Sequence, residues 1–164
     1  MNLAELTIGE LLSLSRGALT ELRRREVLRT GNAPAGDYAE WLVRIATDGQ
    51  LAPNSQTSWD IVTSDDDRLQ VKARMVTNPR DRGQRQFSAF RSWNFDAAVI
   101  VLFDDTFRVW KAARIDAEIL RGAASFTEYV NAYRVLATDD LLALGEDWVP
   151  RLHAVETHPD RARG

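Results

Sequence analysis

The sequence predicts an α/β domain, with a mixed central sheet flanked by helices and a helical N-terminal element. Leucines recur at helical spacing over residues 5–29, which indicates that the chain begins with a helical segment. Short runs rich in β-branched and aromatic residues follow between residues 59 and 113, and such runs are typical of strands. Helical patterns return after residue 115. A helix, a run of strands and further helices predict one layered domain.

Breaker residues divide the chain into three parts. A linker around residues 30–37 is rich in glycine and proline, which interrupt helices. It separates the N-terminal element, residues 1–31, from the main domain, residues 36–155. Residues 156–164 show no periodicity, so we expect a flexible tail there.

The N-terminal element has two interpretations. In the first, residues 7–25 resemble a helix-turn-helix, with Gly9 in the first helix, a turn at Ser13–Ser15 and Leu19 in the second helix. In the second, the element is a helical arm that packs on the main domain or on a second copy of the chain. The sequence leaves both interpretations open.

The main domain is predicted to begin with a helix and a hairpin. Residues 38–47 place apolar side chains on one helical face, and Gly49 follows as a stop signal. Residues 59–63 and 68–75 are typical of strands, and the polar residues 64–67 form the turn between them.

The strongest strand signal follows this hairpin. Residues 95–103 have the sequence FDAAVIVLF, a continuous apolar run that predicts a central strand buried on both faces. The remaining predictions are short strands at residues 86–90, 106–113 and 133–137, helices at residues 115–121 and 126–131, and a helix from Thr138 to Leu144 that Gly145 ends.

The composition excludes several classes of protein and of site. The chain has no cysteine, so it has neither disulfides nor thiolate metal ligands. Its two histidines, His153 and His158, lie near the C-terminus, which argues against a histidine metal site. No apolar run approaches the roughly 20 residues of a membrane span, and the N-terminus lacks the pattern of a secretion signal. We therefore expect a cytoplasmic protein with no membrane partner.

One segment is strongly basic, although the formal net charge of the chain is −3. Between Arg68 and Arg91 the single acidic residue is Asp81. A basic segment of this kind can bind a phosphate backbone locally, and an ordinary arginine-rich surface is the alternative. The candidate DNA contacts are Arg74, Arg80, Arg82, Arg85 and Arg91.

Three polar residues of the predicted hairpin are expected to converge. Residues two apart in a strand share a face, so Gln70 and Lys72 point to one side while Leu69 and Val71 point to the other. Asp60 lies on the partner strand, beside this pair. An acid, an amide and an ammonium group then meet at an edge of the sheet.

These residues resemble the motif of the PD-(D/E)XK nuclease superfamily, which has the restriction-endonuclease-like fold. The motif places an acid on a first helix, an aspartate on the first strand of a hairpin and (D/E)-x-K on the second strand. Here Glu40, Asp60 and the run QVK at residues 70–72 match those positions. Glutamine replaces the usual carboxylate of the motif, and Trp59 replaces a proline. The resemblance covers residues 37–103.

The resemblance implies a Mg²⁺-dependent endonuclease that hydrolyses phosphodiester bonds in DNA, with Mn²⁺ able to substitute for Mg²⁺. It gives catalytic roles to Glu40, Asp60, Gln70 and Lys72. The first three bind the metal ion through oxygen atoms, and Lys72 orients the attacking water or neutralises the phosphate. Many enzymes of this fold act as dimers, and cutting both strands of a duplex favours two sites, so we expect a homodimer.

Simpler roles exist for the same residues. Glu40 follows Asp37 by three residues, which is the spacing of a helix capping box. Gln70 and Lys72 alone fit the polar face of a half-exposed strand. Because Gln70 replaces a carboxylate, a catalytically inactive DNA-binding protein with the nuclease fold is the alternative function.

Overall fold

The structure, a computed structural model, describes residues 1–31, 33–53, 55 and 58–157, so the tail predicted at residues 156–164 lies almost entirely outside it. None of the described helices combines the length and the hydropathy needed to cross a membrane. The helices are α1 (Ile8–Arg24), α2 (Pro34–Ala46), α3 (Ala117–Ala123), α4 (Asp139–Leu142) and α5 (Val149–Glu156). The strands are β1 (Gln50–Leu51), β2 (Ile61–Val62), β3 (Arg68–Met75), β4 (Ala97–Phe103), β5 (Val109–Asp116), β6 (Ser125–Thr127), β7 (Ala132–Arg134) and β8 (Glu146–Asp147).

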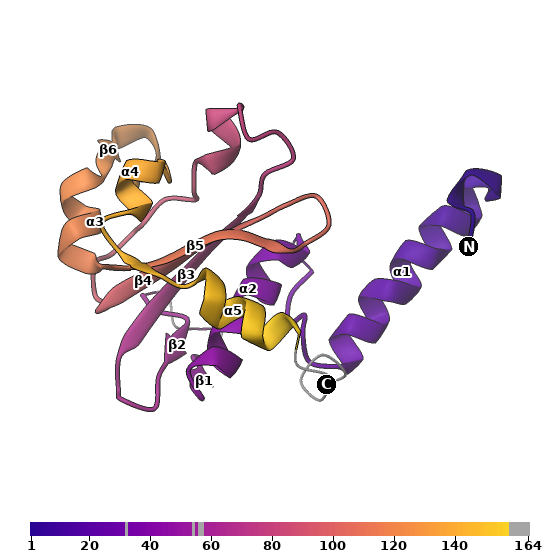
Figure 1. Ribbon diagram of the computed structural model, residues 1–164, viewed down its shortest axis with the longest axis horizontal. Helices are drawn as coiled ribbons and strands as arrows, with labels where there is room; N and C mark the ends of the chain where they lie inside the picture. Colours follow the sequence, from indigo (N-terminus) through magenta and orange to yellow (C-terminus); the bar gives the residue numbers. More distant parts are fainter. Residues whose placement is uncertain (32, 54, 56–57, 158–164) are drawn as a thin grey trace.

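A six-stranded sheet in the order β1-β2-β3-β4-β5-β8 forms the centre of the molecule (Figure 1). β3 and β4 run parallel, whereas the other neighbouring strands are antiparallel. The parallel pair extends from Leu69 opposite Ala97 to Met75 opposite Phe103. The prediction of a mixed central sheet flanked by helices is therefore confirmed.

Apolar layers cover both faces of this sheet. α2 and α5 pack on one face, where Leu42, Leu69 and Leu152 belong to one buried cluster. The segment between β3 and β4, together with α3 and α4, covers the other face and buries Phe90 and Leu120. All seven residues of β4 are buried, as expected for the central strand.

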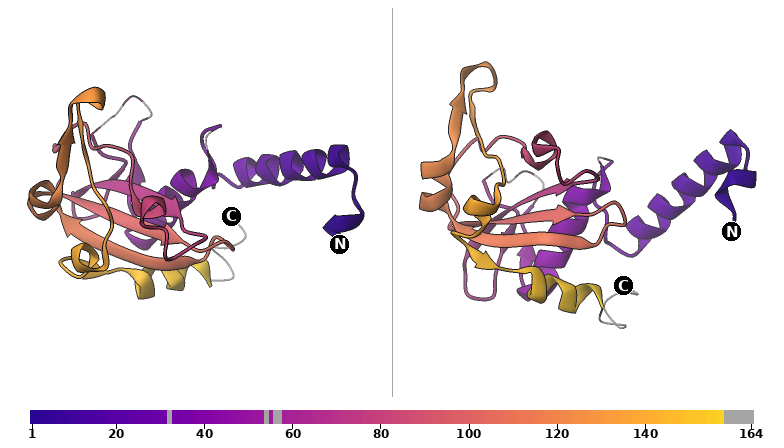
Figure 2. Two further views of the ribbon diagram at one scale, coloured as in Figure 1. Left: turned by 90° about the horizontal axis from the view of Figure 1, so that it is seen from above. Right: turned by 45° about the horizontal axis from the view of Figure 1, so that its top comes forward.

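The N-terminal residues form one continuous helix, α1, that extends away from the sheet (Figures 1 and 2). Thr7 and Glu10 form a capping box at its start, in which each side chain accepts a hydrogen bond from the backbone N–H of the other. All residues of α1 are described, and the turn expected at Ser13–Ser15 does not occur. The helix-turn-helix interpretation is therefore wrong, because two serines among strong helix formers do not interrupt a helix.

Residues 86–90 do not form the expected strand. Gln86 and Phe90 instead form isolated bridges to Leu136 and Tyr133. These bridges hold the segment beside β7, above the polar face of β3. The residues are therefore extended because of a long-range pairing and not because of a regular strand.

Residues 126–131 do not form the expected helix. They belong to β6 and to one 3-10 turn, Glu128–Val130, after which Asn131 adopts positive φ and the chain returns as β7. The hairpin projects from the end of the molecule opposite α1 (Figure 2). The sequence pattern also misses α5, whose eight residues are too few to show a clear helical period.

Candidate active site

Asp60 has a fixed position beside β3. It directly precedes β2, and its backbone N–H donates to the Leu69 carbonyl at 2.8 Å. Its own carbonyl accepts from the Ala52 N–H at 2.8 Å. These hydrogen bonds tie Asp60 to β3 on one side and to the residue after β1 on the other, so the sheet determines where its side chain points.

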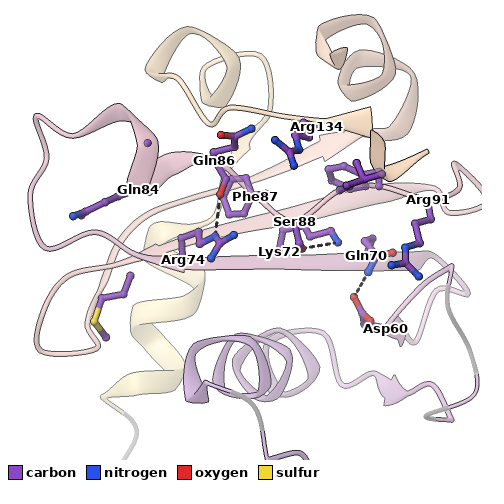
Figure 3. A pocket seen from close by; sticks show the side chains of 15 residues that line it. Asp60, Gln70, Lys72, Arg74, Gln84, Gln86, Phe87, Ser88, Arg91 and Arg134 are labelled. Atoms are coloured by element: carbon purple, nitrogen blue, oxygen red, sulfur yellow. Dashed lines mark hydrogen bonds between the residues drawn. The ribbon is translucent and has the colours of Figure 1, made fainter. Parts of the chain in front are cut away.

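The Asp60 carboxylate completes the edge of β3. β2 is two residues long, so in the described part of the chain no strand continues past Leu69 along this edge of β3, the edge opposite β4. There Asp60 Oδ2 accepts from the Val71 N–H at 2.7 Å. It also accepts from Gln70 Nε2 at 2.5 Å (Figure 3). Among the same described residues, Oδ1 accepts no hydrogen bond. One carboxylate oxygen is therefore committed to the sheet and the other can bind a ligand.

The alternation along β3 separates polar from apolar side chains as the sequence predicts. Leu69 and Val71 belong to the buried cluster under α2. Gln70, Lys72 and Arg74 point to the opposite face, where they line a cleft (Figure 3).

The Lys72 ammonium makes two contacts in this cleft. Nζ donates to Ser88 Oγ at 3.2 Å and lies 4.9 Å from the centre of the Phe90 ring. Burial lowers the pKa of Lys72, and the nearby Asp60 carboxylate offsets part of that effect. A lysine in this setting releases a proton more readily than an exposed lysine does.

Glu40 reaches the same site from α2. Its carboxyl group is half-buried, and Arg29 Nη1 lies 3.7 Å from Glu40 Oε2. A cavity of about 280 Å³, called the acidic cavity below, is lined by the three acids Asp37, Glu40 and Asp60. Burial raises the pKa of Glu40 to about 7, and the Asp60 and Asp37 carboxylates add to that effect. Burial also raises the pKa of Asp60.

The capping-box interpretation of Glu40 is wrong. α2 begins at Pro34, before the position that this interpretation requires. Asp37 instead turns back to the preceding segment, where Oδ2 accepts from the N–H groups of Arg29 and Thr30 at 2.7 and 2.6 Å. Helix capping therefore does not account for Glu40, whose carboxyl group lines the acidic cavity.

A cleft of about 880 Å³ opens on the polar face of β3 (Figure 3). Its charged lining consists of Lys72, Arg74, Arg91 and Arg134 with a single acid, Asp60. Four cations and one carboxylate make this surface positive, which favours a polyanionic ligand. Asp60 lines both this cleft and the acidic cavity, so the two parts of the site meet at that residue.

Two of the five predicted DNA contacts line the cleft and three do not. Arg74 and Arg91 are part of its lining, and Arg74 Nε donates to the Gln86 carbonyl at 2.9 Å. Arg80 and Arg82 are exposed in the loop that follows β3, outside the lining. They can reach only a ligand that extends beyond the cleft.

Arg85 does not face the cleft, in contrast to its predicted role as a DNA contact. Its Nη2 pairs with Asp139 Oδ1 at 2.5 Å, and its guanidinium lies over the Trp110 ring. The side chain is only 12% exposed, and Lys111 pairs with the same aspartate at 2.8 Å. Asp139 at the start of α4 therefore gives Arg85 a structural partner that the sequence pattern does not reveal.

Two arginines of the site were not among the sequence candidates. Arg134 lines the cleft because β7 lies beside Phe90, whose N–H donates to the Tyr133 carbonyl at 2.7 Å. Arg29 lines the acidic cavity, and its Nη2 donates to the Ala52 carbonyl at 3.3 Å. Both positions depend on contacts between distant segments, which leave no local signal in the sequence.

The oxygen donors of the site fit a hard divalent cation. Glu40 and Asp60 supply carboxylate oxygens and Gln70 supplies an amide oxygen, which are ligand types of Mg²⁺ and Mn²⁺. Burial raises the pKa of both carboxyl groups, and a bound cation would offset that effect. Within the described ranges, no three His, Cys, Asp or Glu side chains gather as a metal cluster. Beside the two carboxylates, Gln70 offers a third oxygen donor to a cation in this site.

The chain matches no protein-family model and no curated protein sequence. The function is therefore argued from the geometry of the site. That geometry brings Glu40, Asp60, Gln70 and Lys72 together around one junction of two cavities.

Proposed function

We propose that this chain is a metal-dependent DNA endonuclease that hydrolyses phosphodiester bonds and has a restriction-endonuclease-like fold. The position of Asp60 carries the proposal. Its carboxylate lies where the acidic cavity shared with Glu40 meets the cationic cleft that contains Lys72. Metal-dependent phosphodiester hydrolysis needs both parts, because the metal ligands must lie beside a surface that binds phosphate.

The order of the elements supports the resemblance to the nuclease motif. Glu40 comes from α2, Asp60 from the residue before β2, and Gln70 and Lys72 from β3. β4 then pairs parallel with β3. The motif requires this sequence of helix, hairpin and strand, and the main departure from it is the glutamine at position 70.

The cationic cleft supports the proposed binding of DNA. Arg74, Arg91 and Arg134 are placed to contact backbone phosphates, which position a nucleic acid without specifying its sequence. Binding through such contacts releases counterions, so affinity falls as the salt concentration rises.

Hydrolysis adds water to phosphorus and breaks one P–O bond to a sugar. A Mg²⁺ ion held by Glu40, Asp60 and Gln70 would act as a Lewis acid and lower the pKa of a water molecule. Gln70 would turn its amide so that Oε1 replaces Nε2, which gives up the hydrogen bond to Asp60. Lys72 Nζ stabilises negative charge on the phosphate or transfers a proton, for which its lowered pKa suits it.

Plasmid nicking tests this proposal. Supercoiled DNA is incubated with Mg²⁺ or Mn²⁺ and either the wild type or the Asp60→Ala or Lys72→Ala variant. Asp65→Ala, in an exposed turn, and Lys111→Ala, paired with Asp139, are matched controls outside the site. We expect the wild type and the controls to nick the plasmid and the two site variants to be slower by ~100-fold or more. Equal nicking by all five proteins rules out this site.

A DNA-binding protein without nuclease activity is the second candidate. The hydrogen bond between Gln70 and Asp60 favours it, because it satisfies the aspartate without a metal ion. This candidate predicts salt-sensitive binding of DNA and no cleavage with any divalent ion. Two results together would support it: the wild type binds DNA but never nicks it, and the double variant Arg74→Gln/Arg91→Gln no longer binds DNA.

A further inference from the structure

Helix α1 presents an apolar stripe that no other described part of the chain buries. The stripe follows a helical spacing of three and four residues. None of the helix's residues, all of which are described, is buried, and Ile8 and Leu12 are 79% and 68% exposed. The stripe consists of Ile8, Leu11, Leu12, Ser15, Ala18, Leu19 and Leu22.

This helix needs a partner to be stable. An isolated helix of this length is marginal in water, because tertiary packing of the apolar face supplies most of its stability. The capping box of Thr7 and Glu10 secures only its first turn. A contiguous exposed stripe of large aliphatic side chains marks an interaction surface.

An apolar groove of about 460 Å³ lies at the foot of α1, where the helix meets the main domain. Leu19 and Leu22 form one wall of the groove, so the groove continues the apolar stripe. Side chains from the 27–41 segment, from the turn between β4 and β5 and from α5 form the rest: Val27, Leu28, Pro34, Tyr38, Trp41, Thr106, Phe107, Val155 and Glu156, with Arg25 beside them.

We propose that α1 pairs antiparallel with α1 of a second copy and that each helix fills the groove of the other copy. With the two-fold axis level with Arg16 and Gly17, Leu11 lies opposite the partner's Leu22, and Leu12 lies within one helical turn of the partner's Leu19. The small Ser15 and Ala18 then face each other at the centre and permit close approach of the helices. Ile8 continues past this contact into the partner's groove.

The self-complementary shape of the surface selects a second copy as the occupant. The exposed N-terminal half of α1 has large aliphatic side chains and lacks a wall, whereas the C-terminal half belongs to an open groove. A two-fold axis places the aliphatic N-terminal half of each helix against the groove at the C-terminal half of the other, which is the arrangement of an isologous interface. A parallel pair would leave both grooves open and would set Ile8 against the partner's Ile8. This proposal does not depend on the nuclease function.

Sedimentation equilibrium of the full chain tests the dimer. The wild type is expected at twice its mass of 18.5 kDa at micromolar concentration. The Leu11→Glu variant places a charge in the stripe and should weaken the dimer by ~100-fold or more. Thr20→Glu, on the opposite face of α1, is the matched control and should leave the dimer intact. A monomeric wild type, or a Leu11→Glu variant with the wild-type dimer affinity, would overturn the proposal.

Disulfide formation tests the antiparallel orientation, because the natural chain has no cysteine. Leu11→Cys and Leu22→Cys variants, one of them tagged, are mixed and oxidised. The antiparallel pair predicts disulfides mainly between the two different variants. Disulfides mainly between identical Leu11→Cys chains would show a parallel pair and overturn the proposal. Flotation of a monomeric wild type with anionic vesicles would assign the stripe to a membrane surface instead.

Discussion

Gln70 donates its side-chain amide to the Asp60 carboxylate at 2.5 Å. The same carboxylate oxygen accepts from the Val71 backbone N–H, so both contacts hold Asp60 against the edge of the sheet. The PD-(D/E)XK motif usually has a second carboxylate where Gln70 stands. The glutamine therefore lowers the negative charge of the site by one unit and satisfies Asp60 in the absence of a cation.

Replacing Gln70 by glutamate should lower the stability of the metal-free protein and raise its affinity for metal. Without metal, Gln70→Glu removes a donor to Asp60 and sets a half-buried carboxyl group beside it, so the free energy of unfolding should fall by about 1–3 kcal/mol. With the additional carboxylate, the affinity for Mn²⁺ should rise by about tenfold or more. Denaturation curves and Mn²⁺ titrations measure the two effects. Gln86→Glu, exposed in the same cleft, is the control, and an unchanged Mn²⁺ affinity in Gln70→Glu would show that residue 70 is not a ligand.

The raised pKa of Glu40 links stability to pH. The folded-state pKa is about 7 and the ordinary value is 4.5, so the folded protein binds this proton more tightly than the unfolded chain does. The stabilisation is complete below pH 4.5 and is lost as the pH rises through 7. Glu40→Gln should therefore be more stable than the wild type at alkaline pH, by at most ~3 kcal/mol, and the difference should shrink towards acid pH.

Urea denaturation at several pH values measures this difference between Glu40→Gln and the wild type. Glu118→Gln, exposed on α3, is the control and should show no such trend. If the free energies of unfolding of Glu40→Gln and the wild type differ by the same amount at every pH, the result would contradict the burial of Glu40 beside Asp60.

Lys72 should titrate below the ordinary lysine pKa of about 10.4. Its burial favours the neutral amine, and the Asp60 carboxylate opposes that effect. Asp60→Asn should therefore lower the pKa of Lys72 further. The chain has two lysines, so NMR of the ¹³C-methylated protein gives few resonances, and Lys72→Arg identifies the relevant one. A Lys72 pKa that does not respond to Asp60→Asn would show that the two groups are not neighbours.

Arg91 and Arg85 should differ in their effects although both belong to the basic segment. Arg91 lines the cleft, so Arg91→Gln should weaken DNA binding and reduce the slope of log affinity against log salt by about 1. Arg85 pairs with Asp139, so Arg85→Gln should leave DNA binding unchanged and lower stability by about 1–3 kcal/mol. Fluorescence anisotropy at several salt concentrations and denaturation curves separate the two results. Equal losses of DNA affinity would place Arg85 in the binding surface after all.

The strands that carry the site follow directly from sequence periodicity. The alternation in β3 places Gln70 and Lys72 opposite Leu69 and Val71, and the apolar run of β4 is buried throughout. Both signals are local, because the sheet imposes a period of two on each strand. The proximity of Asp60 also follows from a short hairpin.

Features that depend on distant contacts were not predictable in this way. Arg85 and Arg91 both belong to the basic segment, and the pairing of Arg85 with the distant Asp139 separates their roles. Arg134 enters the cleft through the pairing of β7 with the 86–90 segment. α2 begins at Pro34, and Asp37 contacts the distant Arg29–Thr30 backbone instead of the helix start, so the capping-box spacing at Glu40 was misleading.

Anomalous diffraction from crystals soaked in Mn²⁺ tests the central claim most directly. The account predicts one Mn²⁺ peak between the carboxyl groups of Asp60 and Glu40, with the Gln70 amide turned so that its oxygen faces the ion. A peak confined to other acids, such as those of the exposed 65–67 turn, or no peak at saturating Mn²⁺, would contradict it.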